Sequence, residues 1–154
     1  REDIRPHAGV VPTGRHMSEF LGGCLCGGIR YRLGAKSSHA AHYHCSQCRR
    51  ASGAAFLTWV AFPAVSFAFI QGAPRIYRAT DKAERSFCPD CGTPLTFRHV
   101  DSAHQVDVTA GSLDNAQDVQ PVHHIWDSAK LGWLNMGDGL PRYPGERDGS
   151  EDMP

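Results

Sequence analysis

The chain has 154 residues, 41% of them hydrophobic, which is the size of one compact domain with a single core. Sixteen basic residues balance sixteen acidic ones, so the charge argues against a nucleic acid or an anionic membrane as partner. No segment approaches the roughly 18 apolar residues of a membrane-spanning helix, and no signal-peptide pattern is present. We therefore expect a cytoplasmic protein that acts on a small or locally recognised partner.

Residues 1–17 differ in character from the rest of the chain. They show no hydrophobic periodicity, and His16-Met17 has the sequence that a common cloning junction leaves in front of an inserted gene. We expect this segment to be an expression tag, with a native N-terminal arm as the alternative. A single β domain is expected at residues 18–145. The last residues are rich in Gly, Pro and charge, which predicts a mobile tail at 146–154.

Short segments typical of β-strands dominate the chain after Met17. They are rich in β-branched and aromatic residues and lie between Gly, Pro or Asp breaks. These segments are residues 29–33, 56–62, 65–70, 75–80, 94–100 and 104–110. Helical patterns are short, at residues 46–53 and near 126–134, and strands do not alternate with helices. The sequence predicts an all-β protein, a twisted multi-stranded fold with short helices.

All six cysteines fall in close pairs. The pairs are Cys24 and Cys26 in GGCLCGG, Cys45 and Cys48 in HCSQC, and Cys88 and Cys91 in FCPDCG. A structural zinc takes four thiolate or imidazole ligands in a tetrahedron, and a close pair presents two of them from one turn. On a strand C-x-C places both sulfurs on one face, and C-x-x-C does so through a tight turn that Pro and Gly favour. Two pairs can therefore form one zinc site, and spacing alone leaves open which pairs combine.

Three other uses of the cysteine pairs fit the sequence less well. Disulfides suit an even number of cysteines, but nothing marks the chain as secreted, and the cytosol keeps thiols reduced. A redox C-x-x-C normally accompanies a strand–helix–strand pattern, which the sequence does not show. Buried inert cysteines are common in cores, but three close pairs are not expected by accident. The pairs therefore predict zinc binding, while saying little about the chemistry.

Four motifs, in their order along the chain, give a more specific indication. They are GGCLCGGIRY, HCSQCRRASGAAF, FCPDCGTPLTF and PVHHIWDSAKLGWLNMGDGLPRYPG. Together they resemble the glutathione-dependent formaldehyde-activating enzyme family, which also includes centromere protein V, and the resemblance spans roughly Gly22 to Pro144. It implies a twisted β fold built on zinc knuckles, with two zinc sites. The family's structural zinc takes the C-x-C pair and the last C-x-x-C pair, which correspond here to Cys24, Cys26, Cys88 and Cys91.

The family's second zinc is held by three cysteines in a C-x-C-x-x-C run, and its fourth position is open to a thiol substrate. The last two ligands of that run correspond to Cys45 and Cys48, but the first falls on Tyr43. Alternation along a strand independently places Tyr43 and Cys45 on one face, with His42 and His44 on the other unless the strand bulges. The second site is therefore one ligand short, unless a histidine or a water completes it.

The resemblance implies addition of glutathione to formaldehyde, giving S-hydroxymethylglutathione, in a carbon–sulfur lyase reaction. Zinc with an open position can bind a thiolate and lower its pKa beside an aldehyde. We expect a zinc-dependent enzyme acting on such a thiol adduct, with Cys45 and Cys48 catalytic. Tyr43 and Arg49 are expected to contact the substrate, since a guanidinium can hold a carboxylate through two hydrogen bonds. The alternative is a non-catalytic, zinc-stabilised β module that binds a protein or small ligand, its second metal site lost through Tyr43.

Overall fold

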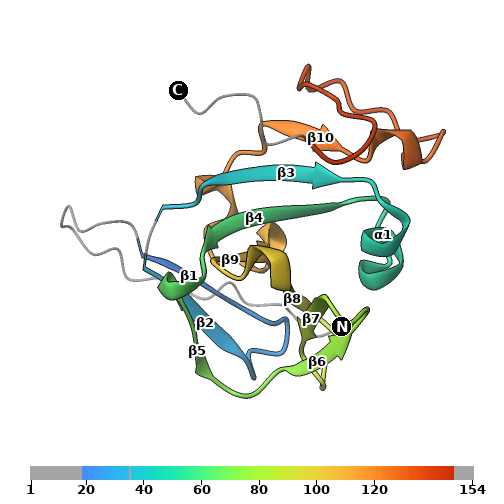
Figure 1. Cartoon of the computed structure of the whole chain (residues 1–154). Helices are drawn as coiled ribbons and strands as arrows, with labels where there is room; N and C mark the ends of the chain where they lie inside the picture. The colour runs from blue at the N-terminus through green and yellow to red at the C-terminus, as the bar shows by residue number, and fades with distance from the viewer. Residues whose placement is uncertain (1–18, 35, 148–154) are drawn as a thin grey trace, which may run out of the picture.

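The computed structural model describes residues 19–34 and 36–147, and within them ten strands form two sheets beside a single α-helix (Figure 1). The strands are β1 Phe20–Gly23, β2 Arg30–Leu33, β3 His39–Tyr43, β4 Leu57–Pro63, β5 Phe67–Gln71, β6 Arg75–Arg78, β7 Ala83–Phe87, β8 Pro94–His99, β9 Gln105–Thr109 and β10 His123–Ile125. The helix α1 spans Ser46–Ser52. The all-β fold class is confirmed; residues 1–17 and most of the proposed tail lie outside the described residues.

The smaller sheet has the strand order β1-β2-β5, and the larger has the order β10-β3-β4-β9-β8-β7-β6. All paired strands are antiparallel except β10, which runs parallel to β3. In Figure 1, β10, β3 and β4 lie side by side above the small sheet. In this strand order β3, which leads into α1, lies between β4 and β10, and β10 comes from a distant part of the chain.

The core lies between the two sheets. Tyr31 and Leu33 of β2 and Val60, Phe62 and Val108 of the large sheet are fully buried members of one hydrophobic cluster. Within each strand these residues are two positions apart, so they lie on one face of their sheet. Burying a side chain of this size stabilises the fold by about 1.5–3 kcal/mol, and the shared cluster therefore fixes which face of the large sheet turns inward.

The other face of the large sheet carries a row of side chains from four neighbouring strands. Strand pairing aligns Arg85 of β7 with Phe97 of β8, then with Asp107 of β9 and Ala61 of β4. Trp59 lies two residues before Ala61 and therefore on the same face. The register of four strands thus brings an arginine, an acid and two aromatic rings together on the outward face of the sheet.

Six of the ten strands, and α1, occur where the sequence predicts them. The strands β1, β3, β7 and β10 were not predicted. The prediction of a helix near 126–134 is wrong. The chain forms a 3-10 turn at Asp127–Ala129, because Trp126 has a left-handed φ of 56° and Lys130 returns to extended backbone. Among the described residues, no helix combines the length and apolar character needed to cross a membrane.

Candidate functional site

Four cysteines meet where two turns come together. Cys24 and Cys26 follow β1, and Cys88 and Cys91 follow β7, so that their sulfurs all lie within 4.8 Å of one another. The Cys24–Cys26 and Cys26–Cys88 sulfur distances are 3.5 and 3.7 Å. Two sulfurs bound to a tetrahedral zinc at about 2.3 Å are about 3.8 Å apart. The four-cysteine set therefore has the spacing of a tetrahedral metal site.

Local hydrogen bonds hold these sulfurs in place. The Ile29 amide donates to Cys24 Sγ at 3.2 Å, and Thr93 Oγ1 lies 3.2 Å from Cys91 Sγ. The hydrogen bond with Thr93 lowers the pKa of Cys91 to about 5. A hydrogen bond with the Gly28 backbone lowers the pKa of Cys26, but hydrogen bonds with the neighbouring thiols outweigh it and raise that pKa to about 12. Four thiolates this close repel one another, and a divalent cation would remove that repulsion.

The remaining two cysteines line a pocket of about 350 Å³. Strand β3 ends at Tyr43, and Cys45 then caps α1, its sulfur accepting a hydrogen bond from the Cys48 amide at 3.3 Å. The first turn of the helix brings the Cys48 sulfur to 2.7 Å from that of Cys45. Tyr43, Trp59 and Trp126 contribute aromatic walls. The pocket thus presents two sulfurs beside aromatic rings, and polar side chains such as Glu146 also line it.

The Cys45–Cys48 pair does not have the geometry of a zinc site. Its sulfurs are 2.7 Å apart, about 1 Å closer than two thiolates on a tetrahedral zinc. Within residues 19–34 and 36–147, no group of three potential metal ligands includes either cysteine. Tyr43 occupies the third position, and burial raises the pKa of its phenol, which keeps the oxygen protonated. The residues present therefore do not fit the family's second zinc.

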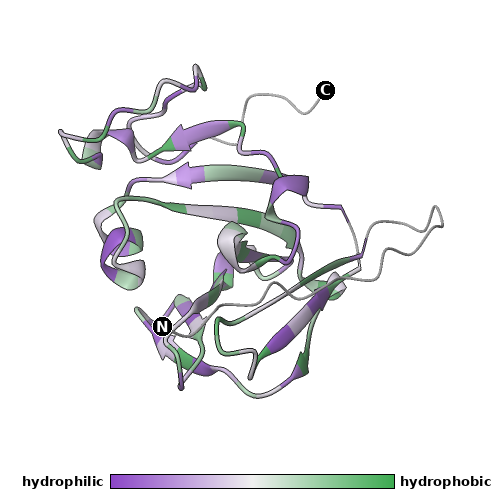
Figure 2. Cartoon of the chain, turned by 180° about the vertical axis from the view of Figure 1, so that it is seen from behind, coloured by the Kyte–Doolittle hydropathy of each residue, from purple (hydrophilic) through white to green (hydrophobic). Residues whose placement is uncertain are grey.

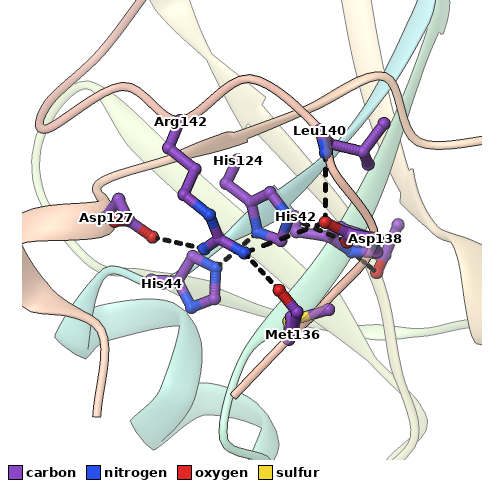
Figure 3. Close-up of polar contacts among 9 residues, drawn as sticks. His42, His44, His124, Asp127, Met136, Asp138, Leu140 and Arg142 are labelled. Carbon is purple, nitrogen blue, oxygen red and sulfur yellow. Dashed lines mark hydrogen bonds and ion pairs between the residues drawn. The ribbon is translucent and has the colours of Figure 1, made fainter. Parts of the chain in front are cut away.

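Neither upstream histidine completes the pair. The register between β3 and β4 is continuous from His39 to Tyr43, so no bulge turns the strand. His42 Nδ1 lies 2.8 Å from Thr58 Oγ1, and His44 Nε2 lies 2.8 Å from His124 Nδ1 (Figure 3). Both imidazoles are held on the side of β3 opposite Tyr43, as strand alternation predicts.

These histidines belong to a separate polar cluster beside the C-terminal segment. His124 is fully buried, and its Nε2 lies 2.9 Å from Asp138 Oδ2. Arg142 donates to Asp127 Oδ1 at 3.0 Å and lies 3.8 Å from Asp138 (Figure 3). Figure 2, which shows the molecule from behind, colours β10 and both ends of β3 as hydrophilic, because histidines occupy these positions. The contact of Asp138 with His124 and the ion pairs of Arg142 therefore hold the C-terminal segment against β10 and β3.

Arg85 supplies the positive charge of the pocket. Its guanidinium carbon lies 4.9 Å from the Phe97 ring centroid and 5.9 Å from that of Trp59, and its Nη2 lies 3.9 Å from Cys48 Sγ. None of the ion pairs found in the described part of the chain involves Arg85. The hydrogen bond from Cys45, helped by this charge, lowers the pKa of Cys48 to about 6. The sequence analysis missed Arg85; its position three residues before Cys88 was the available signal.

Arg49, expected to contact the substrate, does not line this pocket. It borders a smaller hollow, of about 280 Å³, with Arg50, Leu131 and Trp133. One residue advances a helix by 100°, so Cys48 and Arg49 of α1 point in different directions. Of the sequence-predicted residues, the structure brings together Tyr43, Cys45 and Cys48.

Comparison with known proteins agrees with this architecture. Residues 19–129 match the family of the glutathione-dependent formaldehyde-activating enzyme. A Schizosaccharomyces pombe protein named as an uncharacterized lyase is 28% identical over 102 residues, which are 61% of this chain and 68% of that protein. A crystal structure of a Rhodobacter sphaeroides protein shares the fold with a TM-score of 0.52 at 19% identity, covering 80% of this chain and 98% of that one. The chain belongs to the glutathione-dependent formaldehyde-activating enzyme family.

Proposed function

We propose that the protein is a carbon–sulfur lyase-type enzyme that makes or breaks the bond between the glutathione sulfur and an aldehyde carbon. Family membership and the name of the yeast relative support a lyase-type role related to glutathione and formaldehyde. The observation that carries the proposal is the pocket itself, in which Cys45 and Cys48 lie beside the guanidinium of Arg85.

In this proposal zinc is structural and binds Cys24, Cys26, Cys88 and Cys91. Four thiolates in a tetrahedron are a donor set typical of structural zinc. Bound there, the metal would link the turn after β1 to the turn after β7, and so link the small sheet to the large one. Its binding energy would be folding energy, and no reaction step passes through it.

For this reaction the pocket has to position the two reactants and stabilise the charges that form on them. The thiol of glutathione loses a proton, its sulfur forms a bond to the aldehyde carbon, and the aldehyde oxygen takes up a proton; the reverse breaks the same bond. Arg85 can hold a thiolate or a carboxylate of glutathione. The protonated phenol of Tyr43 can donate a hydrogen bond to the aldehyde oxygen. Since the residues do not fit a second zinc, these side chains are assigned the chemistry.

Exchange spectroscopy with ¹³C-formaldehyde and glutathione tests the proposal. The two compounds interconvert with S-hydroxymethylglutathione spontaneously, so the measured quantity is the exchange rate with and without protein. We expect the wild type to accelerate exchange and Arg85→Gln to lose most of that acceleration. Arg75→Gln, which changes an exposed arginine on β6, is the matched control. Equal exchange rates with and without wild-type protein contradict the proposal.

A second candidate is the non-catalytic, zinc-stabilised β module. The observation that favours it is Tyr43, which replaces the third thiolate of the family's open metal site and leaves Cys45 and Cys48 without a further ligand. This candidate predicts that the pocket binds a small ligand or a protein segment without accelerating any exchange. Calorimetric titration with glutathione beside the exchange measurement separates the two, because binding without acceleration supports the module.

A further inference from the structure

Among the described residues, the two sulfurs of the pocket lie closer together than the neighbouring sulfurs of the four-cysteine set. The Cys45–Cys48 distance of 2.7 Å contrasts with 3.5 and 3.7 Å in the four-cysteine set. A disulfide bond is about 2.05 Å long, whereas two thiolates on a tetrahedral zinc are about 3.8 Å apart. The pocket pair is therefore nearer to the covalent distance than to the metal-bound one.

The pocket pair lies at the junction between a strand and a helix. The pair lies between β3 and α1, and α1 leads into β4, so the knuckle joins a strand to a helix even though β3 and β4 are antiparallel. The sequence did not show this because β3 lacks a strand pattern. The Cys48 amide and the Arg85 guanidinium both point at sulfur, and both favour a thiolate in the pair.

We infer that Cys45 and Cys48 form a dithiol–disulfide couple that exchanges electrons with small-molecule disulfides such as glutathione disulfide. The activity lies beyond the lyase-type function and does not rest on it, because exchange needs only the two sulfurs and access to them. A pocket of about 350 Å³ is within the range of small-molecule sites. The Arg85 guanidinium contacts Cys48 Sγ and the Phe97 ring, and its further N–H groups can meet a carboxylate of the incoming disulfide.

The exchange proceeds in two balanced steps. Cys45 is half-buried and Cys48 is only 3% exposed, so a bulky disulfide reaches the Cys45 sulfur first. Cys48 first loses its proton to solvent, and the Cys45 thiol, which donates to the Cys48 sulfur, then passes its own proton across that contact. The resulting Cys45 thiolate attacks one glutathione sulfur. The sulfur–sulfur bond of glutathione disulfide breaks, and one glutathione leaves as a thiolate that takes up a proton from water. Cys48 then loses its proton to solvent and attacks Cys45, releasing the second glutathione as a thiolate that is protonated in turn.

In sum, the cysteine pair loses two electrons and two protons, and glutathione disulfide becomes two molecules of glutathione. The reverse reaction, with two glutathione molecules, restores the dithiol. The four-cysteine set is not expected to take part, because its sulfurs are spaced for a metal and hold two turns of the fold together.

Quantitative thiol trapping of the full-length wild type tests the couple. The reduced protein is equilibrated in buffers of increasing glutathione disulfide to glutathione ratio, quenched with acid, denatured, alkylated and digested with trypsin. The tryptic peptide from Ser37 to Arg49 holds both pocket cysteines and no other cysteine. We expect it to lose two hydrogens and both alkylation sites as the ratio rises, and to regain them when the ratio is reversed. The peptides of the other four cysteines should remain fully alkylated.

Two outcomes would overturn the inference. One is full alkylation of Cys45 and Cys48 in the folded protein at every ratio. The other is a second equivalent of zinc in wild-type protein that Cys45→Ser removes, since a metal would then occupy the pair. Cys48→Ser and Cys45→Ser test the order of attack: the first should trap one glutathione on Cys45, and the second should react several-fold more slowly at the buried Cys48.

Discussion

Replacing Tyr43 by cysteine tests whether one missing thiolate is what distinguishes this pocket from a zinc site. Tyr43 pairs with Leu57 at the end of β3 and lines the pocket beside Cys45 and Cys48. A thiolate at residue 43 would provide a third sulfur, and solvent would complete the tetrahedron. We expect zinc content to rise from about one to about two atoms per chain.

The structure sets the energies of this substitution. Removing the partly buried Tyr43 ring should destabilise the metal-free variant by about 2–4 kcal/mol, since a large side chain leaves a cavity. The Cys45–Cys48 sulfurs must also separate from 2.7 Å to about 3.8 Å before zinc fits. Zinc at 100 times its Kd returns about 2.7 kcal/mol. The zinc-loaded variant should therefore approach wild-type stability, and a chelator should reveal the deficit.

Tyr43→Ser is the matched control, because it removes the same ring and leaves a side chain of similar size without a thiolate. Plasma mass spectrometry measures zinc per chain after gel filtration, and urea unfolding with and without zinc measures the free energy of unfolding. Both variants should lose similar stability without zinc, and only Tyr43→Cys should regain it. A folded Tyr43→Cys protein that holds one zinc in zinc-replete buffer refutes the reasoning, and the knuckle would then be a structural turn.

Three further predictions follow from the two sulfur sets and the buried histidines. Cys88→Ser should abolish folded protein while Cys45→Ser leaves the melting temperature near wild type, since Cys88 belongs to the four-cysteine set and Cys45 does not. Equal losses of soluble yield and of melting temperature in the two variants would contradict this division. Arg85→Gln should slow oxidation of the pocket pair by glutathione disulfide several-fold in quenched alkylation, and an unchanged rate would remove its role there. Stability to urea should fall as the pH drops from 6.5 towards 4, because burial lowers the pKa of His44 and His123 to about 4 and the unfolded chain binds protons first; equal stability at pH 7 and pH 5 would contradict this.

The strands that the sequence predicts are those whose own residues favour extended structure. Segments such as 56–62 and 104–110 carry alternating β-branched and aromatic residues, and they form β4 and β9. Strand β3 consists of histidine and alanine apart from its last residue, Tyr43, and β10 contains two adjacent histidines, so neither has a strong local preference for extended structure. Their pairing depends on His42 meeting His124 across a long stretch of chain. Contacts of that kind are set by tertiary packing and leave no periodic signal.

The candidate site divides in the same way. Spacing and family resemblance were enough to place Cys45, Cys48 and Tyr43 together, because all three lie within one strand–turn–helix segment. Arg85 comes to the pocket through the register of β7 with β8 and β9, which only the assembled sheet defines. Arg49 was expected because it follows the knuckle in sequence, but the rotation of α1 turns it towards another hollow.

The separation of the two sulfur sets explains how the pocket can lack a metal without loss of the fold. The four-cysteine set follows β1 and β7, and it links those turns whether or not any ion is near α1. The pocket pair follows β3, where strand pairing with β4 and β10 already fixes the backbone. Because backbone pairing rather than a metal positions Cys45, Tyr43 in place of a third thiolate changes the chemistry of the sulfurs and not their location. Two sulfurs held at 2.7 Å without a third ligand are then free to form a bond to each other.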